Sequence, residues 1–122
     1  MSIWKSEDVR TIVATAQFLL GAALFVAPWL LGFAGESGPA WTAWASGGLI
    51  GLVGIINFAD DQSWPSRANF LMGAWTLVAP WMIPFADSGA AVFSHLAVGL
   101  FVVLTSVWEI SNSENRTPRV TA

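Results

Sequence analysis

Three polar side chains stand out in long apolar stretches of this sequence: Gln17, Asn69 and His95. The two amides could hydrogen-bond to each other or to a polar solute. An imidazole in such surroundings could relay protons, ligate haem or contact a quinone. Those roles need further ionisable groups or a second axial ligand, and His95 is the only histidine in the chain. We therefore expect a neutral His95 bonded to a hydroxyl or a backbone carbonyl, and we treat the three residues as a candidate polar site.

The sequence contains no catalytic, metal-binding or cofactor-binding motif. It has no cysteine, which excludes disulfides, thiolate chemistry and cysteine-based zinc sites. It also lacks a glycine-rich phosphate loop, a Ser-His-Asp set and a pair of carboxylates inside an apolar stretch. We expect neither enzymatic activity nor a bound metal or cofactor.

The placement of charge predicts a membrane protein. The chain has 122 residues, of which five are Lys or Arg and eight are Asp or Glu, and none of these falls in four long windows: 11–35, 37–59, 68–86 and 88–108. A bilayer core about 30 Å thick is crossed by roughly 20 apolar helical residues. A soluble domain needs a polar face on each element, so a soluble enzyme is excluded. The lipid bilayer is the expected partner, and the absence of a dense basic cluster excludes nucleic acid.

The windows and the loops between them divide the chain into five segments. These are a cytoplasmic N-terminus (1–10), a first hairpin (11–59, with spans of about 11–33 and 41–59), a cytoplasmic loop (60–67), a second hairpin (68–110, with spans of about 68–86 and 90–110) and a cytoplasmic tail (111–122) expected to be disordered. Short loops join antiparallel neighbours. The prediction is an all-α membrane protein, a four-transmembrane-helix bundle made of two tandem parallel helical hairpins.

The basic residues predict the orientation of this bundle. All five lie before the first span, between the second and third, or after the fourth: Lys5, Arg10, Arg67, Arg116 and Arg119. In a four-span protein these places share one side of the membrane. The positive-inside rule then puts both termini in the cytoplasm.

The sequence contains an internal repeat. A shift of 52 residues superposes Gln17–Ala34 on Asn69–Ala86, with ten of 18 positions identical. The identities include Gly21 with Gly73, Pro28 with Pro80 and Trp29 with Trp81. Each copy holds two spans, so both enter the membrane in the same direction. This differs from the inverted repeats of many transporters.

An amide, then a glycine, then Pro-Trp near the outer end of the first helix of each hairpin resembles the pattern of the SPW-repeat bacterial membrane proteins. The resemblance covers roughly residues 11–110 and implies a small integral protein of the bacterial inner membrane, without implying a particular activity. Ala27 and Ala79 stand where the family motif has serine, and Gly32 is replaced by Pro84 in the second copy.

The motif residues also have a direct physical reading. Pro28 and Pro80 cannot donate to the helical hydrogen-bond ladder, so they predict a kink in the last turn of spans one and three. This kink would seat Trp29 and Trp81 at the headgroup interface, where indole rings are favoured.

Small residues form a stripe on the second span. Gly47, Gly51 and Gly54 lie at positions i, i+4 and i+7, and such stripes allow close helix packing in lipid. Gly21 and Gly73 are expected to act in the same way in spans one and three. The sequence leaves open whether the stripe faces the inside of the bundle or another subunit.

Three functions are compatible with these observations. The leading hypothesis is a structural or accessory protein that acts through helix–helix contacts, as a homo-oligomer or with another membrane protein. The second is a small-solute channel or transporter lined by Gln17, Asn69 and His95. The third is a haem- or quinone-associated membrane component, in which bis-histidine ligation would require two copies of the chain.

Overall fold

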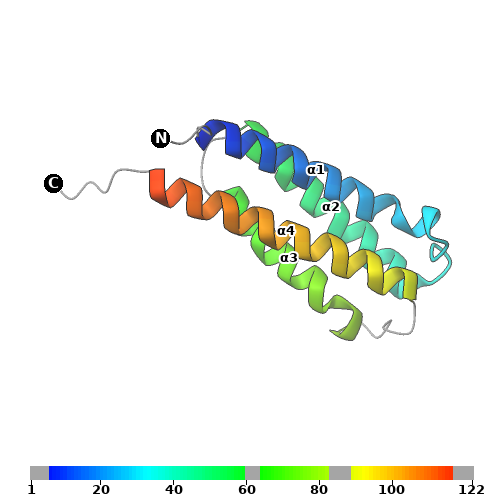
Figure 1. Cartoon of the computed structure of the whole chain (residues 1–122). Coiled ribbons are helices and arrows are strands. Elements are labelled where there is room, and N and C mark those ends of the chain that lie inside the picture. The colour runs from blue at the N-terminus through cyan, green and yellow to red at the C-terminus, as the bar shows by residue number, and fades with distance from the viewer. Residues whose placement is uncertain (1–5, 60–63, 83–88, 117–122) are drawn as a thin grey trace.

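The computed structural model describes residues 6–59, 64–82 and 89–116, which form an antiparallel bundle of four helices (Figure 1). The helices are α1 (Ser6–Leu30), α2 (Ser37–Ala59), α3 (Trp64–Met82) and α4 (Gly89–Arg116). These residues contain no β-strand. The predicted all-α four-helix architecture is confirmed. The start of α1 and the end of α4 lie at the same end of the bundle (Figure 1), as an even number of antiparallel helices requires.

The helix boundaries repeat with the sequence. α1 ends at Leu30 and α3 at Met82, and α2 begins at Ser37 and α4 at Gly89, so each pair of boundaries differs by 52 residues. Pro28 and Pro80 each lie two residues before the end of their helix. A proline in the last turn removes one backbone donor while most of the helical ladder stays intact. The duplicated Pro-Trp motif thus marks the end of the first helix in both hairpins.

The helix ends differ from the apolar windows that the sequence defines. α1 begins before residue 11 and ends before residue 33, and α4 continues from residue 110 to Arg116, so the first part of the predicted disordered tail is helical. Hydropathy locates the lipid-embedded part of a helix, but polar residues in water can prolong the helix. Residues 1–5, 60–63, 83–88 and 117–122, which include parts of the predicted termini and loops, lie outside the described residues.

A glycine ends α1 and turns the chain back onto the core. Gly32 has a φ of 84°, and Leu31 N donates to Ala27 O at 2.8 Å. The next residue, Phe33, is 1% exposed and belongs to the hydrophobic core. A positive φ of this kind is favoured by glycine, which has no Cβ.

Three described helices are long and apolar enough to cross a bilayer: Val9–Leu30, Ser37–Ala59 and Gly89–Ser111. The described part of α3 is not among them, because its 19 residues include Arg67 and Asn69 in the first two turns. Its role as a fourth span stays a prediction.

The four helices form a closed square. The partners of each hairpin pack most extensively, α1 with α4 and α2 with α3 close the sides, and α2 touches α4 only slightly across the diagonal. Leu24, Ile50 and Val102 are fully buried in the shared core. Large apolar side chains cover the outside, as expected for a surface that faces lipid; Leu30 is 76% exposed.

The glycine stripe of α2 lies against α1 of the same chain. A Cβ atom added to Gly47 would lie 2.6 Å from both Gly21 O and Phe25 N, and one added to Gly54 would lie 2.8 Å from Phe18 N. These neighbours are backbone atoms, which cannot move aside without displacing a helix. The backbones of α1 and α2 are therefore in direct contact, and the stripe faces the inside of the bundle.

At the equivalent positions of the second hairpin, the backbones of α3 and α4 approach each other less closely. A Cβ on Gly73 would lie 3.1 Å from Gly99 O, and one on Gly99 would lie 3.0 Å from Gly73 O. The Cβ added to Gly73 would also meet the side chain of Val103, and the one added to Gly99 would meet that of Leu77; both side chains are flexible. Val103 replaces the glycine found at position 51, so α3 and α4 pack through side chains as well as backbone.

Substitution at Gly47 should be much more costly than at the adjacent Gly48. A methyl group on Gly47 meets backbone, whereas one on Gly48 meets the Phe25 ring at 3.7 Å, an ordinary contact. We expect Gly47→Ala to lower the free energy of unfolding by about 1–3 kcal/mol. Gly48→Ala, the matched control, should be neutral or stabilising because alanine favours helix. Thermal unfolding in detergent, followed by circular dichroism, measures both; equal effects would contradict the packing of α1 on α2.

Candidate functional site

A hydrogen-bonded polar network occupies the middle of the bundle. Asn69 Nδ2 donates to Gln17 Oε1 at 2.7 Å, and lies 3.5 Å from the backbone oxygen of Ile50. Gln17 Nε2 in turn donates to Ser106 Oγ at 2.9 Å and to Thr105 Oγ1 at 3.1 Å. Gln17, Asn69 and Ser106 are 0% exposed. The network thus connects α1, α3 and α4 through three fully buried side chains and the partly buried Thr105.

A second polar pair lies nearer the end of the bundle where α2 stops. Asn57 Nδ2 donates to Glu109 Oε1 at 2.7 Å. Asn57 is 0% exposed and Glu109 is 7% exposed. Within the described residues Glu109 makes no ion pair, and the Asn57 amide donates a hydrogen bond to its carboxylate. A hydrogen bond to a charged group is roughly twice as strong as one between neutral groups.

The two pairs follow the symmetry of the repeat. Gln17 and Asn69 are 52 residues apart, and so are Asn57 and Glu109. Each pair therefore joins equivalent positions of the two hairpins, across the diagonals α1–α3 and α2–α4. Equivalent side chains can meet only near the axis that relates the copies. The polar groups consequently mark the pseudo-twofold axis of the bundle.

The structure brings Gln17 and Asn69 together but leaves His95 apart from them. His95 is fully buried in α4, and its Nδ1 lies 2.8 Å from Ala91 O, one turn earlier. A carbonyl oxygen only accepts, so Nδ1 carries the proton of this bond. Ser106, which contacts Gln17, is 11 residues further along α4, about 16 Å away by helical rise. His95 therefore does not belong to the same polar site as Gln17 and Asn69.

The motif residues occupy the opposite end of the bundle from the Asn57–Glu109 pair. Pro28 and Pro80 are buried, whereas Trp29 and Trp81 are 56% and 61% exposed. Pro80 cannot donate to the carbonyl of Thr76, four residues earlier. The Thr76 hydroxyl donates to Met72 O at 2.8 Å, within its own helix, and so does not replace the bond that the Thr76 carbonyl loses. The indoles are thus exposed near the helix ends, a position consistent with the predicted headgroup interface.

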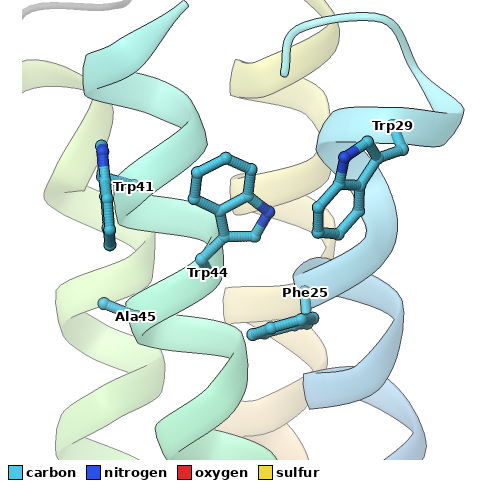
Figure 2. Close-up of a pocket in the computed structure, with 5 residues that line it drawn as sticks. All are labelled: Phe25, Trp29, Trp41, Trp44 and Ala45. Carbon is cyan, nitrogen blue, oxygen red and sulfur yellow. The ribbon is translucent and has the colours of Figure 1, made fainter. Parts of the chain in front are cut away.

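Aromatic side chains from α1 and α2 form an open groove beside this motif (Figure 2). Trp44 lies between Trp29 and Trp41, with ring centroids 5.2 and 5.4 Å away, and Phe25 lies 6.0 Å from Trp29. The groove has a volume of about 380 Å³ and Ala45 is its remaining lining residue. Rings at these distances touch one another. They leave no space for a cation between neighbouring rings, so the arrangement fits an interfacial anchor better than an aromatic cage.

Several residues of the polar centre could not be recognised individually from the sequence. Thr105 and Ser106 are ordinary in a membrane helix, and Glu109 lies near a helix end where a carboxylate is unremarkable. The available signal was the 52-residue offset, which pairs Glu109 with Asn57 as it pairs Gln17 with Asn69. A further cross-helix bond, from Trp75 Nε1 to Ser46 Oγ at 3.2 Å, carries no such signal.

Apart from the Glu109 carboxylate, the side chains of this centre are amides and hydroxyls. Within residues 6–59, 64–82 and 89–116 no three His, Cys, Asp or Glu side chains converge as metal ligands would. Amides and hydroxyls are neutral hydrogen-bonding groups that join helices in lipid, at about 0.6 kcal/mol for an average interhelical bond.

These features define an integral membrane protein of duplicated helical hairpins, joined by polar contacts near its pseudo-twofold axis. The model of the SPW repeat domain matches residues 11–109, and the chain belongs to this family. The resemblance seen in the doubled Pro-Trp motif is thereby confirmed. Comparison with curated proteins and with solved structures gives no match.

The Gln17–Asn69 contact should be measurable as a coupling energy. Gln17→Leu removes the acceptor of Asn69 Nδ2 inside the bundle, and we expect a loss of about 1–3 kcal/mol in unfolding free energy. The double variant Gln17→Leu/Asn69→Leu should cost less than the sum of the single variants, by about 0.5–2 kcal/mol.

Reversible unfolding in mixed detergent measures this double-mutant cycle. Thr42→Val is the matched control, because buried Thr42 bonds to Gly38 O within its own helix. Its effect should add to that of Gln17→Leu. Additivity in the Gln17–Asn69 cycle as well would contradict a direct contact.

Proposed function

We propose that this protein is a structural or accessory component of the bacterial inner membrane, without catalytic activity of its own. The observation that carries the proposal is the use of the buried polar groups: Gln17 bonds to Asn69, and Asn57 bonds to Glu109, across the bundle. Polar side chains that solvate one another contribute to assembly and specificity rather than to substrate turnover.

The surface available to a partner is aromatic and aliphatic rather than glycine-rich. Gly47 and Gly54 are covered by α1, so they are not accessible to another protein. Trp41 is 67% exposed and Trp29 is 56% exposed, both beside the groove of Figure 2. Exposed tryptophans supply large contact areas and are common at the energetic centre of interfaces. We assign the contact with a second copy or another membrane protein to this side of α1 and α2.

The proposed orientation places both termini in the cytoplasm and the α1–α2 loop outside. Cysteine introduced at Ser37 should react with a membrane-impermeant maleimide on intact cells, and cysteine at Ala59 should react only after permeabilisation. Both positions are exposed, and the natural chain has no cysteine to interfere. The reverse labelling pattern would overturn the orientation.

The accessory role predicts a stable complex. Affinity purification in mild detergent should retain a second copy or another membrane protein at a fixed ratio to the tagged chain. Trp41→Ala should reduce that retention at least several-fold. Leu52→Ala is the matched control, since Leu52 lies on the same helix, is 53% exposed and follows Ala45, the last groove residue of α2, by about two turns. It should leave the complex intact.

A channel or transporter is the second candidate, and one observation favours it. Asn69 Oδ1 is buried without a hydrogen-bond partner in the described residues, beside the amide of Gln17. A polar solute could occupy such a place. A monomeric protein that carries solute across reconstituted vesicles, with flux lost in Asn69→Leu, would replace the structural proposal.

A further inference from the structure

Three buried oxygen atoms in one half of the bundle make no hydrogen bond within the described part of the chain. They are Asn57 Oδ1, Ser66 Oγ and Asn69 Oδ1. Asn57 and Asn69 are 0% exposed and Ser66 is 2% exposed. All three come from the facing segments of α2 and α3. A buried polar group without a partner costs about 1–3 kcal/mol, so three such atoms on two packed helices favour a bound ligand that supplies the missing contacts.

Sequence differences between the two copies of the repeat explain why the α2–α3 side of the bundle has oxygens without partners. In the other half, Gln17 Nε2 donates to Ser106 Oγ and Thr105 Oγ1 of α4. The residue of α2 equivalent to Ser106 is Gly54, which offers no side chain to Asn69. The residue of α1 equivalent to Ser66 is Ala14, which adds no polar group. On the α1–α4 side, the protein itself supplies hydrogen-bond partners for Gln17. On the α2–α3 side, Ser66 adds an oxygen, and Gly54 lacks the hydroxyl that could donate to Asn69.

The three oxygens belong to side chains on neighbouring segments of the packed helices α2 and α3. Asn69 lies beside Ile50 O, and Asn57 follows Ile50 by two turns on the same face of α2. Ser66 precedes Asn69 by one turn on the same face of α3. Helical side chains lean toward the N-terminus of their helix. Because α2 and α3 run antiparallel, Asn57 leans toward the middle of the bundle and Asn69 leans toward Ser66.

The chemistry of these atoms favours a cation. Amide oxygens only accept hydrogen bonds, and hydroxyl and amide oxygens are hard ligands of the kind that alkali and alkaline-earth ions prefer. The Glu109 carboxylate bonds to the nitrogen of the Asn57 amide, whose oxygen is one of the three. A buried charge is stable when it is paired, and one carboxylate balances one positive charge. A divalent ion would leave excess charge in a low-dielectric interior.

We propose that the α2–α3 side of the bundle binds a sodium ion through Asn57 Oδ1, Ser66 Oγ and Asn69 Oδ1, with Glu109 supplying the compensating negative charge. The inference goes beyond the structural role proposed above and is independent of it. Sodium would complete the half of the polar centre that the repeat leaves open, and it would link α2 to α3, which belong to different hairpins.

The test measures thermal unfolding of the full chain in detergent, in NaCl and in N-methyl-D-glucamine chloride at the same ionic strength. A ligand that binds the folded state stabilises it, and Na⁺ at tenfold its Kd should raise Tm by about 5 °C. The same Tm in both salts would overturn the proposal and assign the oxygens to water.

Two variants locate the effect. Ser66→Ala removes an oxygen that has no partner, so it should leave Tm unchanged or higher without Na⁺ and should reduce the Na⁺-dependent rise. Glu109→Gln keeps an acceptor for Asn57 but removes the charge, and should abolish most of the rise. Ser94→Ala is the matched control, because Ser94 is a buried serine bonded to Ala91 O in α4. A rise that persists in both Ser66→Ala and Glu109→Gln would place Na⁺ elsewhere and refute this site.

Discussion

The absence of water from the bilayer core is the constraint on which this structure depends. A polar side chain in that environment needs a partner from the protein. Gln17 meets Asn69 at 2.7 Å, and Asn57 meets Glu109 at the same distance, in each case across a diagonal of the bundle. These two contacts join the hairpins at their common axis. The remaining packing, including the close approach of Gly47 to Gly21, brings the helices near enough for the polar groups to meet.

Gene duplication and divergence account for the asymmetry of the polar centre. The second hairpin retains the motif of the first, and its helix boundaries follow at the same 52-residue offset. Ser106 stands where Gly54 occurs in the first copy, and Val103 stands where Gly51 occurs. As a result, the first hairpin has the closer backbone packing, and the second hairpin has the hydroxyl group that bonds to Gln17. A symmetric ancestor would have the same polar contacts on both sides of the bundle. In this protein the amide of Gln17 has partners on the α1–α4 side, whereas oxygens on the α2–α3 side have none among the described residues.

Much of the fold could be predicted because hydropathy and repetition act over long segments. The charge-free windows indicated four helices, and the doubled Pro-Trp motif indicated the family that the SPW repeat domain model matches. The exact helix ends were less predictable: α4 continues to Arg116 because a helix can extend into water beyond its apolar part. The partners of Gln17 were not predictable, since Thr105 and Ser106 gain their role only from the rotation of α4 about its axis.

The sequence by itself determined the class of protein, the number of helices and the presence of two copies of one hairpin. These follow from composition and periodicity, which are properties of the chain and need no knowledge of contacts. Only the tertiary structure decided that the glycine stripe faces α1 and that His95 lies apart from Gln17 and Asn69. It also showed that three oxygens on α2 and α3 have no hydrogen-bond partner among the described residues. The physical reason is that lipid-embedded helices are apolar on every side, so hydrophobicity does not specify their rotation. Close packing and hydrogen bonds specify the rotation of each helix about its axis.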